Sequence, residues 1–201
     1  MELVLVRHAE PVRIVDAEGP ADPHLTARGK GQAEALAAYL STEHIDAVWS
    51  SPMVRARETA APLAAALGLD VFVDTELAEW DKEATSYIPV EELRATKDER
   101  WVAMVEGDLS AMEGVDPAAF QTGVVRAIEH IITGNAGGTV AVVCHGGVIN
   151  AYLASILGIT KPLWFEPKYT SIHRVLASRR GDRSLQSLNE TAHLRGTDLL
   201  V

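Results

Sequence analysis

The chain has 201 residues, 47% of them hydrophobic, and its 28 acidic and 18 basic side chains give a formal net charge of −10. This length suits one domain with a buried core, and the negative charge argues against a nucleic-acid-binding surface, which needs many Lys and Arg contacts to phosphates. The sequence has no apolar run near the roughly 20 residues of a membrane span and no signal-peptide pattern. Its single cysteine cannot form an internal disulfide. We therefore expect a cytoplasmic protein that binds neither membranes nor nucleic acid.

Strand and helix patterns alternate along the first half of the chain. Ser51 is expected to cap a helix with Pro52 in its first turn and Gly68 just beyond its end. Pro62 should bend or interrupt that helix. In chain order we expect a strand at residues 2–6, a loop at Glu10–His24, a helix opened by Leu25-Thr26, a strand at Ile45–Trp49, the helix after Ser51 and a strand at Asp70–Val73.

The second half begins with a polar segment, Glu91–Asp116, that has partial helical character and is interpreted as an insertion beside the sheet. After it the alternation resumes and ends in a hairpin. The order predicts an α/β fold with a mixed sheet and no internal repeat. The later elements are expected to be a helix from Pro117 to about Ile132, a strand ending at Cys144, a helix at Val148–Leu157, and hairpin strands at Ile172–Ala177 and Leu185–Asn189.

Two apolar runs each deliver a histidine at the end of a predicted strand. Residues 2–6 run directly into Arg7-His8, and residues 139–144 run into His145-Gly146-Gly147. Ligands of parallel sheets bind beyond the carboxyl ends of the strands. The sequence therefore predicts that His8 and His145 face one cleft.

Two further segments are expected to reach the same edge of the sheet, Ser51–Arg57 and Glu76–Glu83. Together the four segments supply imidazoles, guanidinium groups and carboxylates, which suffice for phosphoryl transfer without a metal. Arg55 falls in the first turn of a predicted helix, where backbone N–H groups favour an anion. Arg57, two positions later, should point elsewhere.

The residues of these segments resemble the histidine phosphatase superfamily, also called the phosphoglycerate mutase-like family. The resemblance covers nearly the whole chain and implies a three-layer α/β/α fold with a mostly parallel central sheet. It also implies a single domain over residues 1–201 with a cap-like insertion at about 80–116. The motifs that carry it are Arg7-His8-Ala9-Glu10, Leu25-Thr26 with Gly29 and Gln32-Ala33, the run Ser50–Ala60, the run Cys144–Ile149, and the closing run Leu188–Leu194.

This resemblance implies a covalent mechanism without a cofactor or metal. His8 would attack the phosphorus and become phosphohistidine, which water then hydrolyses. By position, Glu79 resembles the proton donor of the family, and it would protonate the leaving alcohol and then activate water. The phosphate would be bound by Arg7, Arg55, His145 and Gly146.

The identity of the proton donor stays open at this point. The glycine that usually follows four residues after the acid is replaced by Glu83, and the segment is rich in carboxylates. The candidates are Glu79, Glu76, Asp81 and Glu83.

Other conspicuous residues are expected to be structural. A cysteine-phosphatase loop around Cys144 would need an arginine six residues later, where Asn150 stands, so the cysteine is interpreted as a buried strand residue. Trp80 and Trp101 are expected to pack within the insertion. Among the remaining histidines, only His24 is near enough to the predicted cleft to touch a substrate; the others are His44, His130, His173 and His193.

The favoured function is hydrolysis of a small phosphomonoester, from either a phosphorylated metabolite or a phosphoprotein. Two alternatives stay open, a phosphoglycerate mutase and a catalytically weak member that binds phospho-ligands as a sensor. The substrate is expected to be set by the segment Lys82–Asp116, and a homodimer is possible through this insertion or the late hairpin.

Overall fold

The computed structural model describes residues 1–106, 116–161 and 163–200. Its centre is a six-stranded sheet with the order β3-β2-β4-β1-β5-β6. Strands β3, β2, β4 and β1 are parallel to one another. At the other side of the sheet, β5 runs antiparallel to β1, and β6 runs antiparallel to β5. The expected α/β fold with a mostly parallel, mixed sheet is confirmed. The strands are β1 (Glu2–Arg7), β2 (Ala47–Ser50), β3 (Val71–Val73), β4 (Thr139–Cys144), β5 (Ile172–Ala177) and β6 (Arg183–Glu190).

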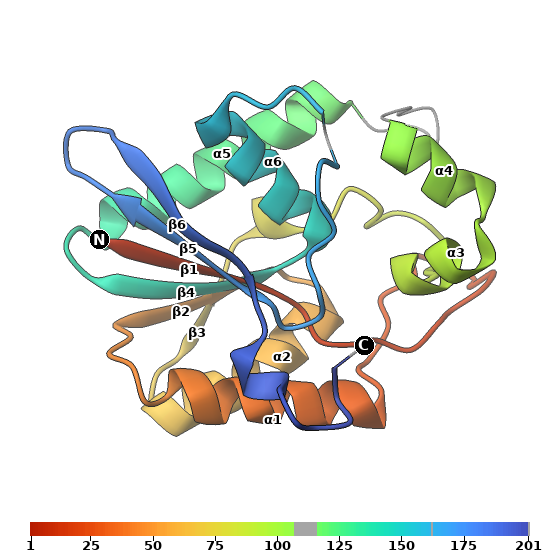
Figure 1. Ribbon diagram of the computed structural model, residues 1–201, viewed down its shortest axis with the longest axis horizontal. Coiled ribbons are helices and arrows are strands. Elements are labelled where there is room, and N and C mark those ends of the chain that lie inside the picture. The colour runs from red at the N-terminus through yellow and green to blue at the C-terminus, as the bar shows by residue number, and fades with distance from the viewer. Residues whose placement is uncertain (107–115, 162, 201) are drawn as a thin grey trace.

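Helices cover both faces of this sheet (Figure 1). Helices α1 and α2 pack on one face, and α5 and α6 pack on the other. Two smaller helices, α3 and α4, lie beyond the end of the sheet at which β1 and β4 finish. Among the described residues, none of the helices combines the length and the apolar character needed to cross a membrane. The helices are α1 (Ala27–Leu40), α2 (Val54–Leu67), α3 (Val90–Thr96), α4 (Glu99–Glu106), α5 (Pro117–Gly134) and α6 (Gly146–Leu157).

The central strands explain why the core has two halves. Side chains of a strand alternate between the two faces of a sheet. In β1, Leu3 and Leu5 therefore join the core under α5 and α6, whereas Val4 and Val6 join the core over α1 and α2. All four side chains are completely buried, which is why the strand reads as a continuous apolar run.

The start of α2 differs from the sequence prediction. The helix begins at Val54, and its first N–H donates to the carboxylate of Asp22 (2.9 Å) instead of being capped by Ser51. The Ser51 hydroxyl instead lies 2.7 Å from His145 Nε2. Pro62 does not interrupt the helix, which continues to Leu67 because its apolar face packs into the core.

The predicted insertion contains two short helices, α3 and α4, separated by two residues. Its first part is tied to the loop after β1, because Ile14 and Tyr87 exchange both backbone hydrogen bonds (3.0 and 2.9 Å). The prediction of an insertion up to residue 116 includes 107–115, which lie outside the described residues. What is described places α3 and α4 next to the strand ends that carry the histidines.

Candidate active site

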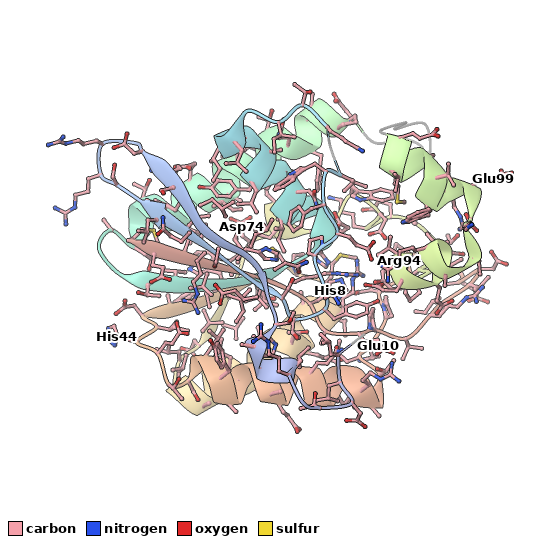
Figure 2. All side chains as sticks on the ribbon, viewed as in Figure 1. His8, Glu10, His44, Asp74, Arg94 and Glu99 are labelled. Carbon is pink, nitrogen blue, oxygen red and sulfur yellow. The ribbon has the colours of Figure 1, made fainter. Side chains whose placement is uncertain are left out.

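His8 and His145 lie side by side because their strands are hydrogen-bonded neighbours. Arg7 pairs with Cys144 in the register of β1 and β4, and the His8 N–H donates to the Cys144 carbonyl (2.9 Å). The two imidazole rings are buried with their centroids 5.1 Å apart. Figure 2 shows His8 at the side of the sheet that faces α3 and α4, with His44 at the far side of the molecule. The predicted convergence of His8 and His145 is thus found.

The surroundings of His8 fix its protonation. Its Nδ1 lies 2.8 Å from the Ala9 carbonyl oxygen, which only accepts, so Nδ1 carries the proton and Nε2 keeps a lone pair. Burial lowers the pKa of His8, and the charges of Arg55 and Arg7 lower it further. At neutral pH the ring is a neutral imidazole, which is the form that can act as a nucleophile.

Arg55 is buried with part of its guanidinium group unused. Nη2 donates to Asp81 Oδ1 (3.4 Å), but Nε and Nη1 have no hydrogen-bond partner among the described residues. Asp22 Oδ1 is 3.8 Å from Nη1, too far for a hydrogen bond. Buried donors without partners are costly, so these two N–H groups define a place for an anion.

Arg7 is held from three sides. Its Nη1 donates to Glu91 Oε1 and to the Pro167 carbonyl (2.6 Å each), and its guanidinium carbon lies 4.2 Å from the centre of the Tyr169 ring. Burial alone would raise the pKa of Glu91, but the charge of Arg7 and their hydrogen bond lower it overall. Glu91 is therefore an ionised partner of Arg7 from the first turn of α3, and no motif in the sequence marks it for this role.

His145 comes immediately before α6. Its Nε2 lies 2.7 Å from the Ser51 hydroxyl, and its Nδ1 has no hydrogen-bond partner within the described part of the chain. Burial lowers the pKa of His145, and so do the charges of Arg55 and Arg7. Gly146 and Gly147 form the first turn of α6, where backbone N–H groups and the helix dipole favour a negative charge.

The structure separates the four candidate acids. Glu79 is buried, accepts a hydrogen bond from Gly147 N–H (2.8 Å), and has its pKa raised to about 7 by burial and by the charge of Asp81. Asp81 also lies in the site, beside Arg55. Glu76 instead forms an ion pair with Arg126, and Glu83 is exposed.

A cavity of about 640 Å³ begins at this cluster and extends outward to α4. Arg7, His8, Arg55, Glu79 and Asp81 line it, whereas His145, which was predicted to face the same cleft as His8, is fully buried and is not among its lining residues. Trp80 and Trp101, which were expected only to pack within the insertion, both line this cavity. The reactive groups are therefore at the bottom of a pocket that the insertion helps to form.

Comparison with known proteins agrees with this arrangement. The profile of the histidine phosphatase superfamily (branch 1) matches residues 3–191. The chain belongs to the histidine phosphatase superfamily. Its fold class and the resemblance inferred from the motifs are thereby confirmed.

Relatives within the histidine phosphatase superfamily carry two kinds of name. Phosphoserine phosphatase 1 of Hydrogenobacter thermophilus is 31% identical over 96% of this chain and 94% of its own length. A probable phosphoglycerate mutase of Yersinia enterocolitica is 28% identical over 79% of this chain and 76% of its own. The crystal structure of Entamoeba histolytica phosphoserine phosphatase with 3-phosphoglyceric acid superposes with a TM-score of 0.74 at 25% identity, covering 96% of this chain and 98% of that one.

Other predicted features of this histidine phosphatase lie outside the cavity. His24 is exposed and pairs with Glu58 (2.7 Å), and it does not line the cavity. Arg57 is exposed, as its position on the helix predicts. Burial raises the pKa of the Cys144 thiol, in keeping with a buried strand residue. No group of three or more His, Cys, Asp or Glu side chains in the described ranges is placed to hold a metal ion.

Proposed function

We propose that the protein is a metal-independent phosphatase that hydrolyses a small phosphomonoester through a phosphohistidine on His8. The observation that carries this proposal is a pair of Arg55 N–H groups, Nε and Nη1, that have no partner in the described part of the chain and lie in the pocket that also holds a neutral His8. A phosphate seated on Arg55 would satisfy both donors, since a guanidinium fork matches phosphate geometry. It would also lie within reach of the nucleophilic Nε2.

In the first step, the His8 Nε2 lone pair forms a bond to phosphorus while the bond to the ester oxygen breaks. The leaving oxygen takes the proton of the Glu79 carboxyl group, whose pKa of about 7 leaves it partly protonated at neutral pH. In the second step, water gives a proton to the Glu79 carboxylate as its oxygen bonds to phosphorus. The bond between phosphorus and His8 then breaks, and inorganic phosphate leaves.

The negative charge on the phosphoryl oxygens is met by groups that are fixed before substrate binds. Arg55 would supply Nε and Nη1, and His145 Nδ1, which has no partner among the described residues, would supply a third contact. Arg7 would contribute the donors that Glu91 and Pro167 do not use, and the Gly146 N–H lies at the start of α6. Preorganised donors of this kind stabilise charge that develops in the transition state.

The relatives support a small phosphorylated metabolite as substrate, because two of them are named phosphoserine phosphatases. A phosphoprotein substrate, a homodimer and a cytoplasmic location stay predictions from the sequence. So does the cap role of residues 80–116, which is supported by the cavity-lining positions of Trp80 and Trp101.

The test is a rapid-quench experiment in EDTA with a panel of phosphomonoesters, followed by mass spectrometry for acid-labile phosphate on His8. We expect a transient adduct on His8 and release of inorganic phosphate. His8→Ala should abolish both, whereas His24→Ala, at an exposed histidine outside the cavity, should retain both.

Other outcomes would contradict the proposal in distinct ways. Transfer of the phosphoryl group to a second hydroxyl instead of water would indicate a mutase. Tight binding of phosphate or vanadate without turnover or adduct would indicate a sensor of phospho-ligands.

A further inference from the structure

The outer half of the cavity is walled by apolar side chains. Trp101, Met104 and Val105 lie at i, i+3 and i+4 on α4 and all line the cavity. Among the described residues, none of α4 is fully buried: Trp101 and Met104 are half-buried and Val105 is exposed. Apolar surface of this kind is stabilised when another apolar group covers it.

A second group of cavity-lining side chains is aromatic and fixed in place. Trp164 and Phe165 line the same cavity, with ring centroids 4.5 Å apart. Asn150, which is buried in α6, holds this segment: its Oδ1 accepts from the N–H groups of Trp164 and Phe165 (3.0 and 3.2 Å), and its Nδ2 donates to the Phe165 carbonyl (3.0 Å). The two walls therefore form a slot that exists before any ligand binds.

The arginines near this slot already have carboxylate partners. Arg100 donates twice to Asp98 (2.8 Å each), and Arg94 pairs with Glu166 (2.8 Å). Lys161 is exposed at the rim. A carboxylate on the substrate would thus meet no buried, dedicated cation in this half of the cavity.

The position of the slot relative to the phosphate site identifies its occupant. In phosphoryl transfer the attacking and leaving oxygens or nitrogens lie roughly in line, so the leaving group points away from His8. His8, Glu79 and residues of α4 line the same cavity, so a leaving group that points away from His8 and takes a proton from Glu79 would extend into the slot. Its volume of about 640 Å³ is within the range of roughly 300–1,000 Å³ typical for sites of drug-sized ligands.

We infer that the preferred substrate is the phosphate monoester of a bulky apolar alcohol, whose aromatic or branched group lies between Trp101 and Met104 on one side and Trp164 and Phe165 on the other. This inference rests on the proposed phosphatase function and adds the class of the leaving group to it. It predicts a preference that differs from that of the relatives named for phosphoserine, a small substrate with an ammonium and a carboxylate group.

The experiment compares kcat/KM for ethyl, butyl, 2-phenylethyl and 2-(naphthyl)ethyl phosphate with kcat/KM for O-phosphoserine and 3-phosphoglycerate. The four esters have primary alcohols of similar basicity, so their differences report binding of the leaving group. We expect kcat/KM to rise at least tenfold from ethyl to 2-(naphthyl)ethyl phosphate, because the added rings bury apolar area in the slot. The two carboxylate-bearing substrates should fall below 2-phenylethyl phosphate.

Matched variants on α4 locate the effect. Trp101→Ala should lower the ratio of kcat/KM between 2-(naphthyl)ethyl and ethyl phosphate by about tenfold, since it removes one wall of the slot. Val102→Ala, at an exposed neighbour that does not line the cavity, should leave the ratio unchanged. A circular dichroism spectrum of each variant checks that it is folded.

Two results would overturn the inference while leaving the phosphatase function standing. One is hydrolysis of all the alkyl phosphates with no dependence on the size of the alcohol. The other is a preference for phosphoserine or 3-phosphoglycerate that Lys161→Ala removes, which would assign the slot to a carboxylate. Absence of hydrolysis for every compound would overturn the proposed function itself, and the inference with it.

Discussion

At the scale of single residues, Glu79 and Asp81 show how two nearby carboxyl groups come to have different properties. Burial raises the pKa of both groups, but Asp81 lies beside Arg55, which favours its charged form. Glu79 accepts only backbone hydrogen bonds, from Gly147 and Trp80, and also feels the charge of Asp81. Glu79 is thus the group that retains a proton near neutral pH and can give it to a leaving alcohol.

The pH dependence of turnover tests this assignment. If protonated Glu79 is the acid, kcat/KM for an alkyl phosphate should fall above about pH 7, because Glu79, whose pKa is about 7, loses its proton there. Asp81→Asn removes the neighbouring charge that helps to raise this pKa, so the fall should move to lower pH. Glu79→Gln should lower kcat/KM by roughly 10²- to 10⁴-fold and abolish the fall.

The control for these variants is Glu83→Gln, at an exposed carboxylate of the same segment, which should change neither the rate nor the pH profile. A large loss in Glu83→Gln, or a wild-type profile that stays flat between pH 6 and 9, would reject Glu79 as the acid. The profile is measured by initial rates over that pH range with an alkyl phosphate.

At the scale of elements, the first turn of α6 holds Glu79 in place. A Cβ added at Gly147 would lie 2.2 Å from Glu79 Oε1 and 2.8 Å from Trp80 Cδ1, so even alanine cannot be accepted without displacing the acid. At Gly146 the nearest atom to an added Cβ is Pro167 Cδ at 3.9 Å, an ordinary contact. Adjacent glycines of one helix turn therefore have different roles.

Gly147→Ala is expected to lower kcat/KM for alkyl phosphates by more than tenfold, because Glu79, the proposed proton donor, would move away from the leaving oxygen. The loss should be much smaller for p-nitrophenyl phosphate, whose leaving group needs no proton. Gly146→Ala should lose much less activity on both substrates, and equal losses in the two variants would contradict the argument. Steady-state kinetics on both substrates, with a thermal melt for each variant, make the comparison.

The sequence predicts elements better than it predicts contacts between them. The strands β1 and β4 and the helices α1 and α5 follow from apolar periodicity and caps such as Thr26, because those signals are local. The motifs also bring His8, Arg55 and His145 to one site. The bond of Glu91 to Arg7 spans 84 residues of the sequence, and Asn150 holds a segment that comes 15 residues later. Neither contact has a local pattern, so the structure was needed to find both.

At the scale of the whole molecule, several histidines are kept neutral by burial, and this makes folding depend on pH. Burial lowers the pKa of His8 and of His145, and it lowers the pKa of His173 to about 3 and that of His193 to about 4. The unfolded chain binds protons on these rings below about pH 6.5, whereas the folded chain does not. The free energy of unfolding therefore falls as the pH drops below that value, by at most about 1.4 kcal/mol per pH unit for each ring.

Glu79 acts in the opposite direction. Its pKa is raised from the ordinary value of 4.5 to about 7 in the folded protein. Between these two pH values the folded chain keeps a proton on Glu79, whereas the unfolded chain has released it, so this group stabilises the fold as the pH falls. Asp81, whose pKa is also raised by burial, acts in the same direction as Glu79. Two carboxyl groups oppose four histidines, so the net expectation is a loss of stability between pH 7.5 and 5.5. Urea denaturation at the two pH values measures it.

Variants at two histidines separate this cause from other acid effects. His173→Asn should reduce the difference in unfolding free energy between the two pH values, because it removes one ring that protonates only when unfolded. His44→Gln, at an exposed ring, should leave the difference unchanged. An equal free energy of unfolding at pH 7.5 and 5.5 in the wild-type protein would contradict the linkage.

The pairing of β1 with β4 has a consequence for how this chain can change its selectivity. Backbone hydrogen bonds between these strands set the spacing of His8 and His145, whereas α4 and residues 163–165 line the part of the cavity proposed to bind the leaving group. The reacting groups and the selective surface are thus encoded in different stretches of sequence. Substitutions in α4 and residues 163–165 can therefore change the lining of the cavity without altering the reacting groups. These two stretches are the positions to randomise when the enzyme is engineered for new phosphate esters.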